Sequence, residues 1–560
     1  MRIKKIEISN FRGHEQTVVE FDAVHALVGE NGSGKTAILE AINFATSPYY
    51  LANRIDEQDF HSADNGNIQI KIEFDGIYIN KVPDGYTHQY LPSSSIQLSV
   101  KRREKAAPGK ALSDGFVISH LSEPITYQKP NELDGAMLPD SVTVADLPVS
   151  VTQTDQGYEI QRKSGKVMKV RPDSVSLNND LVGFPAVFYF GRDREKEAKS
   201  GFNSLLTKIN KDLNWRYRRS WNQDDAQDQW DAYYQPVIGS VEDKKKREII
   251  SPLRTQLQDL LGDDFRTLEL SLLDVEQPFD KAFFALRTGT NQIDISNMGS
   301  GIAMILAYVL LEQISKLADE RPIFLIDEPE LHCHPQLQRK LADHFHLTQG
   351  QTIFSTHSPL LVSLDLWKGI TRLDENRHTF PTEERLNETM GPQTIRQHLD
   401  DIGSWYYHET TFSDSDSDLF FARRVLLVEG PAEKYGLPRL ARLLGKELLD
   451  LTIISCNGKN KIPHYAAVCR AYDVPTFVLF DLDGKPIDDN DNKPIAQATE
   501  NLGSHHFTIS FEDVLDVGKN AEHKSAVVLE KIDSMTKKED VPEDLKKAIN
   551  KISGWPHGDG

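Results

Sequence analysis

The sequence is poor in cysteine, contains no long apolar run and has no excess of basic residues. Its three cysteines, Cys333, Cys456 and Cys469, have no spacing that indicates a disulfide framework or a zinc site, which favours a reducing cytoplasm. No run reaches the roughly 18 apolar residues of a membrane helix, and the first residues do not resemble a signal peptide, so we expect no membrane partner. The formal net charge of −20 excludes a diffuse basic nucleic-acid binder, but not a local groove that holds a phosphate backbone.

What the sequence does contain is a glycine-rich, phosphate-binding pattern near its start. The segment Ala23–Thr36 runs from a short apolar strand into the pattern GxxxxGKT. Glycines let backbone N–H groups close around a polyphosphate, the lysine reaches its terminal phosphates, and the threonine hydroxyl ligates Mg²⁺. The apolar spacing over Thr36–Ala45 predicts the helix that must follow. The loop residues expected to hold the polyphosphate are Asn31, Gly32, Gly34, Lys35 and Thr36.

The acidic strand that such a loop requires lies far downstream. Residues Pro322–Glu330 read as a buried apolar strand that ends in acidic side chains. We expect Asp327 to bind Mg²⁺ and Glu328 to act as the general base on the attacking water. The alternative, two solvated acids at the end of a buried strand, does not explain the segments around it.

Two further segments accompany this strand. Upstream, small residues ending in Ser300 and Gly301 open the strongly apolar helix Ile302–Ile314, and such a helix terminus is suited to a γ-phosphate from another subunit. Downstream, an apolar strand that begins at Thr352 leads to His357.

Together these pieces resemble the ATP-binding-cassette type of ATPase head found in the RecF and structural-maintenance-of-chromosomes group. The opening MRIKKIEISNFRG is also typical of this group. The resemblance implies that Gly29–Thr36 is the Walker A motif, that Asp327 and Glu328 are the Walker B acids, and that the nucleotide is ATP. It also implies that Met298–Gly301 is a shortened signature loop, that His357 is the switch histidine, and that two subunits sandwich the ATP.

A second group of acidic residues lies in the last quarter of the chain. The pattern RVLLVEGPAE predicts a buried strand that ends at Glu429 and a helix that carries Glu433 into the same crevice. The pattern VPTFVLFDLDG predicts another strand, which ends at Asp481 and Asp483. Two aspartates beside a strand end suit a hard cation such as Mg²⁺ or Mn²⁺. Carboxylates gathered at one edge repel one another unless divalent cations neutralise them.

This order of strands, helices and acids resembles the Toprim fold of topoisomerases, primases and some nucleases. With the ATPase head upstream, the chain resembles the OLD (overcoming lysogenization defect) family, whose members cut DNA by a two-metal mechanism. That family adds a Ser-x-Glu motif and a late lysine. Ser510 and Glu512 match the motif, within a stretch that we interpret as the strand Phe507–Leu515, and Lys524 at a helix start is the candidate lysine.

The resemblance also implies roles for these residues. In that mechanism one cation activates water and the other steadies the leaving 3′-oxygen. The resemblance assigns catalytic roles to Glu429, Asp481 and Lys524. Lys524 neutralises charge in the transition state. The implied metal ligands are Asp481, Asp483 and Glu512 for one cation, Glu429 and Glu433 for the other, with Ser510 as a further member of the set.

We expect an α/β protein with an ATPase head, a β-rich lobe, a helical insert and a Rossmann-like Toprim domain. At 560 residues the chain is too long for one core. The expected parts are the N-terminal half of the head with the lobe at 1–185, a helical dimerisation insert at 186–265, the C-terminal half of the head at 266–408, a linker at 409–420 and the Toprim domain at 421–560.

Two segments allow more than one interpretation. Aromatic residues crowd among arginines over Trp215–Tyr234, where stacking on bases is one reading, but we favour helix packing at a dimer contact. The acidic run Asp414–Asp418 imitates the start of a calcium loop. The glycine and glutamate that such a loop requires are absent, so we interpret the run as part of a linker.

Residues and resemblance together predict a cytoplasmic, ATP-regulated, metal-dependent endonuclease that cuts DNA and forms a homodimer or a higher homo-oligomer. The resemblance implies a role in antiviral defence, as for the Gabija nuclease and the OLD effectors of some retrons. A neighbouring-gene product or a retron component is therefore a candidate partner. Two alternatives stay open: a Toprim effector that cuts RNA, including tRNA, and a RecF-like repair ATPase whose Toprim part is a non-catalytic scaffold.

Overall fold

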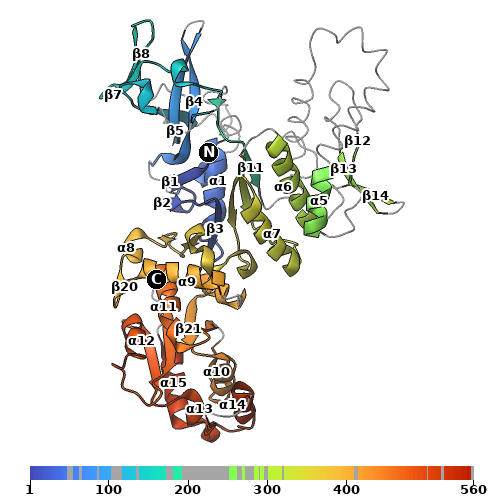
Figure 1. Cartoon of the computed structure of the whole chain (residues 1–560), viewed down its shortest axis with the longest axis vertical. Helices are drawn as coiled ribbons and strands as arrows, with labels where there is room; N and C mark the ends of the chain where they lie inside the picture. Colours follow the sequence, from blue (N-terminus) through green and yellow to red (C-terminus); the bar gives the residue numbers. More distant parts are fainter. Residues whose placement is uncertain are drawn as a thin grey trace. The chain divides into compact units, whose positions relative to one another are not determined.

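The structure is a computed structural model of the chain, and Figure 1 follows it from the N-terminus in blue to the C-terminus in red. It describes residues 1–46, 55–61, 66–84, 87–102, 116–133, 138–139, 141–171, 181–191, 251–261, 268–271, 283–288, 291–294, 300–317, 321–408, 414–448, 450–500, 502–518 and 523–555. Among the helices in these ranges, none is long and apolar enough to cross a membrane. Contacts divide the chain into two units, Met1–Ala26 with Gly34–Thr356 and Leu27–Ser33 with His357–Gly560.

The phosphate-binding loop follows a strand of a six-stranded sheet in the order β11-β15-β16-β3-β17-β18. β11, β15 and β16 pair in parallel, and every residue of β15 and β16 is buried, as expected when helices cover a parallel sheet. Helix α1 packs against these three strands. The bounds are β3 (Val24–Gly29), β11 (Val187–Phe190), β15 (Ile323–Asp327), β16 (Gln351–Ser355), β17 (Ile370–Leu373), β18 (Thr379–Phe380), α1 (Lys35–Thr46), α6 (Ser300–Leu317) and α7 (Pro335–Leu347).

An antiparallel sheet begins with the first residues of the chain and leads into the β-rich lobe. Its order is β2-β1-β4-β5-β6, with β10 paired to β4. The lobe adds the antiparallel sheet β7-β8-β9, and apolar residues of β4, β5, β7 and β8 share one core. The β-rich lobe is therefore confirmed. The bounds are β1 (Ile3–Phe11), β2 (His14–Glu20), β4 (Ile68–Asp84), β5 (Thr87–Arg102), β6 (Phe116–Pro124), β7 (Ser150–Thr154), β8 (Gly157–Gln161), β9 (Val167–Val170) and β10 (Leu181–Val182).

Most of the predicted helical insert at 186–265, including Trp215–Tyr234, lies outside the described residues. The described part consists of β11 and the helix α5 (Ser251–Leu261). After α5 the chain forms an antiparallel sheet of β12 (Leu268–Ser271), β13 (Phe283–Thr288) and β14 (Asn291–Asp294). The dimer contact expected in the insert stays a prediction.

Short elements connect β18 to the C-terminal sheet. They are α8 (Glu383–Leu386), β19 (Thr389–Met390), β20 (Gln393–Thr394), α9 (Ile395–His408) and the 3₁₀ helix η11 (Asp414–Phe421). Within η11, the Asp416 carboxylate accepts a hydrogen bond of 3.0 Å from the Tyr465 hydroxyl, and the Ser417 hydroxyl donates to the carbonyl of Val362 at 2.9 Å. This part of the expected linker is buried against its neighbours, while the domain boundaries themselves stay predictions.

The C-terminal part, drawn in orange and red in Figure 1, contains a parallel sheet in the order β22-β21-β23-β24. Helices α10, α13, α14 and α15 enclose one apolar core with the strands, and α11 packs against β21 outside that core. The bounds are β21 (Arg424–Val428), β22 (Leu451–Ser455), β23 (Thr476–Asp481), β24 (Gly503–Phe507), α10 (Pro431–Leu443), α11 (Ile462–Ala471), α12 (Lys493–Ala498), α13 (Phe511–Val514), α14 (Lys524–Asp533) and α15 (Glu543–Gly554).

One predicted strand is wrong. The stretch Phe507–Leu515 is not continuous, because β24 ends at Phe507 and the helix α13 begins at Phe511. Ser510 causes the change: its hydroxyl oxygen accepts the backbone N–H of Asp513 at 3.1 Å, which caps the new helix. The alternating apolar residues therefore belong to a strand end, a loop and one helical turn.

Candidate functional site

The first candidate site lies in the loop between β3 and α1. Three glycines there have positive φ angles, which side chains with a Cβ rarely adopt: Gly29 at 141°, Gly32 at 84° and Gly34 at 97°. At Gly34 a Cβ would also lie 2.4 Å from Nε2 of His14. Asn31 lies in the same turn, and the buried Lys35 begins α1. The loop thus ends at a helix N-terminus, the setting that binds phosphate.

Thr36 and Asp327 meet at this site although they are far apart in the sequence. The Thr36 hydroxyl donates to the Asp327 carboxylate, at 2.9 Å from Oδ1 and 3.0 Å from Oδ2. The Ser355 hydroxyl at the end of β16 donates to the same buried carboxylate, and its oxygen accepts the backbone N–H of Glu328 at 3.1 Å. The hydroxyl and carboxylate predicted to hold Mg²⁺ are therefore in contact, with Glu328 next in the chain.

The other residues predicted to meet the nucleotide are only partly placed. Ser300 is the first residue of α6, whereas Met298 and Gly299 lie outside the described residues. His357 follows β16 by two positions. Contact of Ser300 and His357 with a nucleotide stays a prediction.

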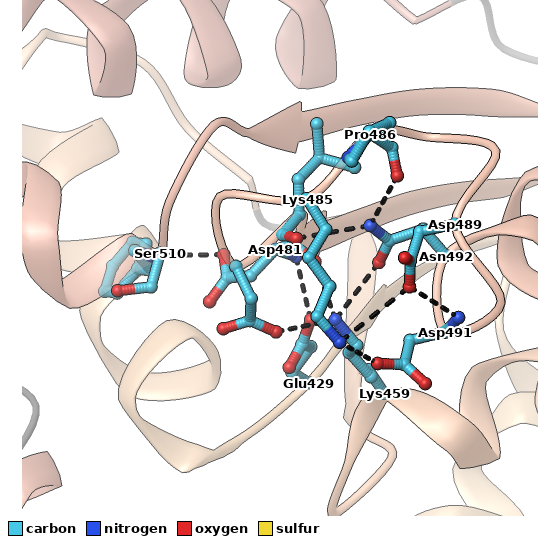
Figure 2. Close-up of polar contacts among 12 residues, drawn as sticks. Glu429, Lys459, Asp481, Lys485, Pro486, Asp489, Asp491, Asn492 and Ser510 are labelled. Atoms are coloured by element: carbon cyan, nitrogen blue, oxygen red, sulfur yellow. Dashed lines mark hydrogen bonds and ion pairs between the residues drawn. The ribbon is translucent and has the colours of Figure 1, made fainter.

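The second candidate site lies at the carboxyl ends of β21 and β23. These strands lie side by side, with β22 on the far side of β21, so the chain changes its winding direction between them, where open α/β sheets bind ligands. Glu429 directly follows β21, and Asp481 is the last residue of β23. The backbone N–H of Asp481 donates to Oε1 of Glu429 at 2.7 Å (Figure 2). The backbone N–H of Phe511 donates to Oδ1 of Asp481 at 3.1 Å, so the start of α13 also holds this carboxylate.

Glu433 joins these acids from the first turn of α10, where its side chain is buried. Burial, together with the charges of Glu429 and Glu433, raises the pKa of Asp481 to about 9. Burial, with Glu512 and Glu429 nearby, raises the pKa of Glu433 to about 8. The pKa of Glu429 is also raised, chiefly by burial. The carboxylates therefore act on one another at one edge of the sheet, and such mutual repulsion favours the binding of a divalent cation.

The Ser-x-Glu pair and the late lysine lie at the starts of α13 and α14. Nζ of Lys524 is 2.8 Å from Oε1 of Glu512, so these two predicted residues are brought together. The Ser510 hydroxyl donates to the carboxylate of Asp513 at 2.6 Å, within its own turn. Ser510 thus shapes the loop that carries Glu512, and its membership in a metal site stays a prediction.

Lys459 is a residue of this site that the sequence interpretation missed. Its Nζ donates to Oδ2 of Asp483 at 2.6 Å. It also donates to the carbonyl oxygen of Asp481 at 3.3 Å and to Oδ1 of Asn492 at 3.1 Å (Figure 2). The only sequence signal is a turn directly after β22, where Gly458 has a φ of 125°. A residue in that turn lies at the same sheet edge as the acids, because all four strands run in parallel.

The donor set suits a divalent cation in its chemistry. Carboxylate oxygens are the ligands that Mg²⁺ and Mn²⁺ prefer, and a bound cation would offset the burial and the mutual repulsion that together raise the pKa values of Asp481 and Glu433. Over the part of the chain that the structure describes, no three His, Cys, Asp or Glu side chains are arranged to hold one ion together.

The fold and the two sites define an ATPase joined to a Toprim domain. Residues 1–362 match the family described as AAA ATPase domain, and residues 420–483 match the family described as overcoming lysogenization defect protein-like, TOPRIM domain. The chain belongs to the AAA ATPase domain family, and with its second domain it is an enzyme of the OLD type, with an ATPase part and a nuclease part. These domains imply the use of a nucleotide and of a divalent metal.

Three nucleases are similar to this chain over most of its length. It is 22% identical to the OLD nuclease of Thermus scotoductus, with 93% of each chain covered. It is 20% identical to the Old nuclease of Escherichia phage P2, and this match covers 86% of this chain and 77% of the phage protein. Endonuclease GajA of Bacillus cereus is 21% identical, over 78% of this chain and 66% of GajA. The predicted resemblance to the OLD family is confirmed.

Proposed function

We propose that this protein is an ATP-hydrolysing, divalent-metal-dependent endonuclease that cuts DNA. The observation that carries the proposal is the contact between Asp481 and Glu429 at the carboxyl edge of the Toprim sheet, to which the buried Glu433 adds a third acid. Phosphodiester hydrolysis needs an activated water and neutralised phosphate charge, and acids at this edge are suited to hold the cations that provide both. The names of the three relatives, all nucleases, support the same activity.

In this proposal two cations, Mg²⁺ or Mn²⁺, bind among the Toprim acids and supply the Lewis acidity for hydrolysis. One cation would be bound by Asp481, Asp483 and Glu512. The other would be bound near Glu429 and Glu433. The Ser510 hydroxyl would complete this set. Lys524, which pairs with Glu512, would offer its ammonium group to the phosphate charge.

The ATPase part would control this chemistry. Thr36 and Asp327 would hold Mg²⁺ with ATP, and Glu328 would accept a proton from the attacking water. Ser300 of a second subunit and His357 would meet the γ-phosphate, so the proposal includes a homodimer. ATP binding would change access to the Toprim acids, and hydrolysis would reset it.

We further infer a cytoplasmic role in bacterial antiviral defence, which the resemblance to the OLD family supports. Nucleic acid would be the main partner of the protein. A neighbouring-gene product or a retron component is a second candidate partner, and copurification from the native host would identify it.

Two substitutions separate the two activities. Glu328→Gln should trap ATP without hydrolysis and alter the response of cutting to ATP. Asp481→Asn removes one charge, while the new amide oxygen still accepts the N–H of Phe511, so it should abolish cutting and leave ATP hydrolysis intact. Loss of both activities in both variants would contradict the two-site scheme. DNA and RNA of the same sequence should be tested side by side. Cutting of the RNA alone would show that RNA, and not DNA, is the substrate.

A further inference from the structure

Lys459 and Asn492 connect two loops at the carboxyl edge of the Toprim sheet. Lys459 comes from the turn after β22, and Asn492 is the fully buried residue that precedes α12. An ammonium group has three N–H donors. The three acceptors around Nζ of Lys459 match this number: the Asp483 carboxylate, the Asp481 carbonyl and the Asn492 side-chain oxygen.

The Asn492 side chain is itself fixed by the turn that contains Asp483. Its Nδ2 donates to the carbonyl oxygens of Leu482 at 3.2 Å and Pro486 at 3.0 Å, which lie on either side of Asp483 in the sequence. Its Oδ1 is therefore the atom left to face Lys459. Asp483 has a φ of 55°, which lies in the left-handed region that few residues with a Cβ other than asparagine and aspartate adopt.

Lys459 is only partly buried, and the acid with which it pairs is exposed. The Lys459 side chain is 14% exposed, compared with 37% for Lys524, while the Asp483 side chain is 41% exposed. A solvated lysine gains little from one exposed acid, because water competes for the ammonium group. Here the ammonium group joins the end of β23 to the turn that follows it, and its charge lies against the second aspartate of the Asp-x-Asp pair.

We propose that Lys459 is a positioning residue of the nuclease reaction. It fixes the Asp483 carboxylate against the end of β23, so that Asp481 and Asp483 present one arrangement to a cation and a scissile phosphate. This inference rests on the proposed nuclease function. Lys459 acts through Asp483 and not by contact with the substrate.

The test compares Lys459→Met with Lys493→Met, a matched loss of an exposed lysine beside Asn492. The measurements are the maximal rate of plasmid nicking, the Mn²⁺ affinity by electron paramagnetic resonance, and the unfolding temperature. Lys459→Met should lower the maximal rate about tenfold or more, because Asp483 loses its fixed position. Mn²⁺ affinity should change little, because the lost positioning of Asp483 and the lost competing positive charge act on it in opposite directions. Lys459→Arg should restore part of the rate.

A maximal rate within about twofold of the wild-type rate would overturn the inference. A slower rate explained wholly by weaker Mn²⁺ binding or by unfolding would overturn it too, because a structural role predicts that pattern. An equal loss of maximal rate in Lys493→Met would overturn the inference as well, because the loss of any nearby positive charge would then explain the slower rate. Failure of the wild-type protein to cut would contradict the proposed function itself, and the wild-type lane distinguishes that result from the others.

Discussion

The backbone N–H of Asp481 donates a hydrogen bond of 2.7 Å to Oε1 of Glu429, and this contact ties together the ends of two parallel strands. The two residues are 52 positions apart, yet they share one sheet edge because β21 and β23 are neighbours. Glu429 therefore both fixes the end of β23 and adds charge to the candidate nuclease site.

Glu429→Gln and Glu429→Leu should separate these two roles. The glutamine oxygen still accepts the N–H of Asp481, so we expect cutting to fall about 100-fold while the unfolding temperature holds or rises. Leucine leaves that buried N–H without its acceptor, which should lower the free energy of unfolding by about 1–3 kcal/mol. Thermal unfolding of both variants measures the difference. Equal unfolding temperatures of the two variants would contradict a stabilising role for the hydrogen bond between Glu429 and the N–H of Asp481.

The stability of the Toprim domain without divalent metal should fall as the pH rises. The pKa of Asp481 is raised to about 9 and that of Glu433 to about 8, whereas the same groups titrate near pH 4 in an unfolded chain. Between these values the folded protein holds more protons than the unfolded chain, so rising pH favours unfolding. Unfolding temperatures in EDTA should fall from about pH 6 to about pH 9, less so in Asp481→Asn. Saturating Mg²⁺ should remove the fall, and a steady rise in EDTA would contradict the prediction.

The ATPase part should lose stability in mild acid through His25. This buried residue of β3 has its pKa lowered to about 3 by burial. An unfolded histidine gains its proton near pH 6.5, so stability is lost as the pH falls below that value, by at most about 1.4 kcal/mol per pH unit. His25→Phe should show a smaller loss of unfolding temperature between about pH 7.5 and about pH 5.5. An unchanged loss would assign the acid sensitivity to other groups.

Thr36 substitutions should test the hydroxyl that donates to Asp327. Thr36→Ser keeps that hydroxyl, so ATP hydrolysis should stay within a few fold of wild type. Thr36→Val has almost the same shape but removes the hydroxyl, and hydrolysis should fall about 100-fold. Phosphate release measures both rates. Similar rates in the two variants would show that the contact with Asp327 has no part in Mg²⁺ binding.

Some residues of the two sites were predictable because short local patterns mark them. The pattern GxxxxGKT fixes the places of Lys35 and Thr36 relative to a helix start. An apolar strand followed at once by an acid marks a sheet edge, which identified Glu429 and Asp481. Their meeting at one edge then followed from the parallel order of the strands.

Other features escaped prediction because they depend on contacts that periodicity does not encode. Ser510 has apolar neighbours at alternate positions, but its hydroxyl starts a helix and ends the strand pattern. Lys459 looks like any lysine in a turn until the fold brings Asp483 and Asn492 to it. The C-terminal helix α15 was not predicted either, although its Leu545 is buried in the Toprim core.

The most direct test of the nuclease assignment is cleavage of supercoiled plasmid by the wild-type protein and by Asp481→Asn, with Mg²⁺ or Mn²⁺ and with or without ATP. We predict nicking or linearisation that requires metal, that is lost in Asp481→Asn, and that changes when ATP is added. The variant should still hydrolyse ATP at the wild-type rate. Metal-dependent cutting that persists in Asp481→Asn, or no cutting by the wild-type protein in any lane, would contradict a DNA nuclease centred on Asp481.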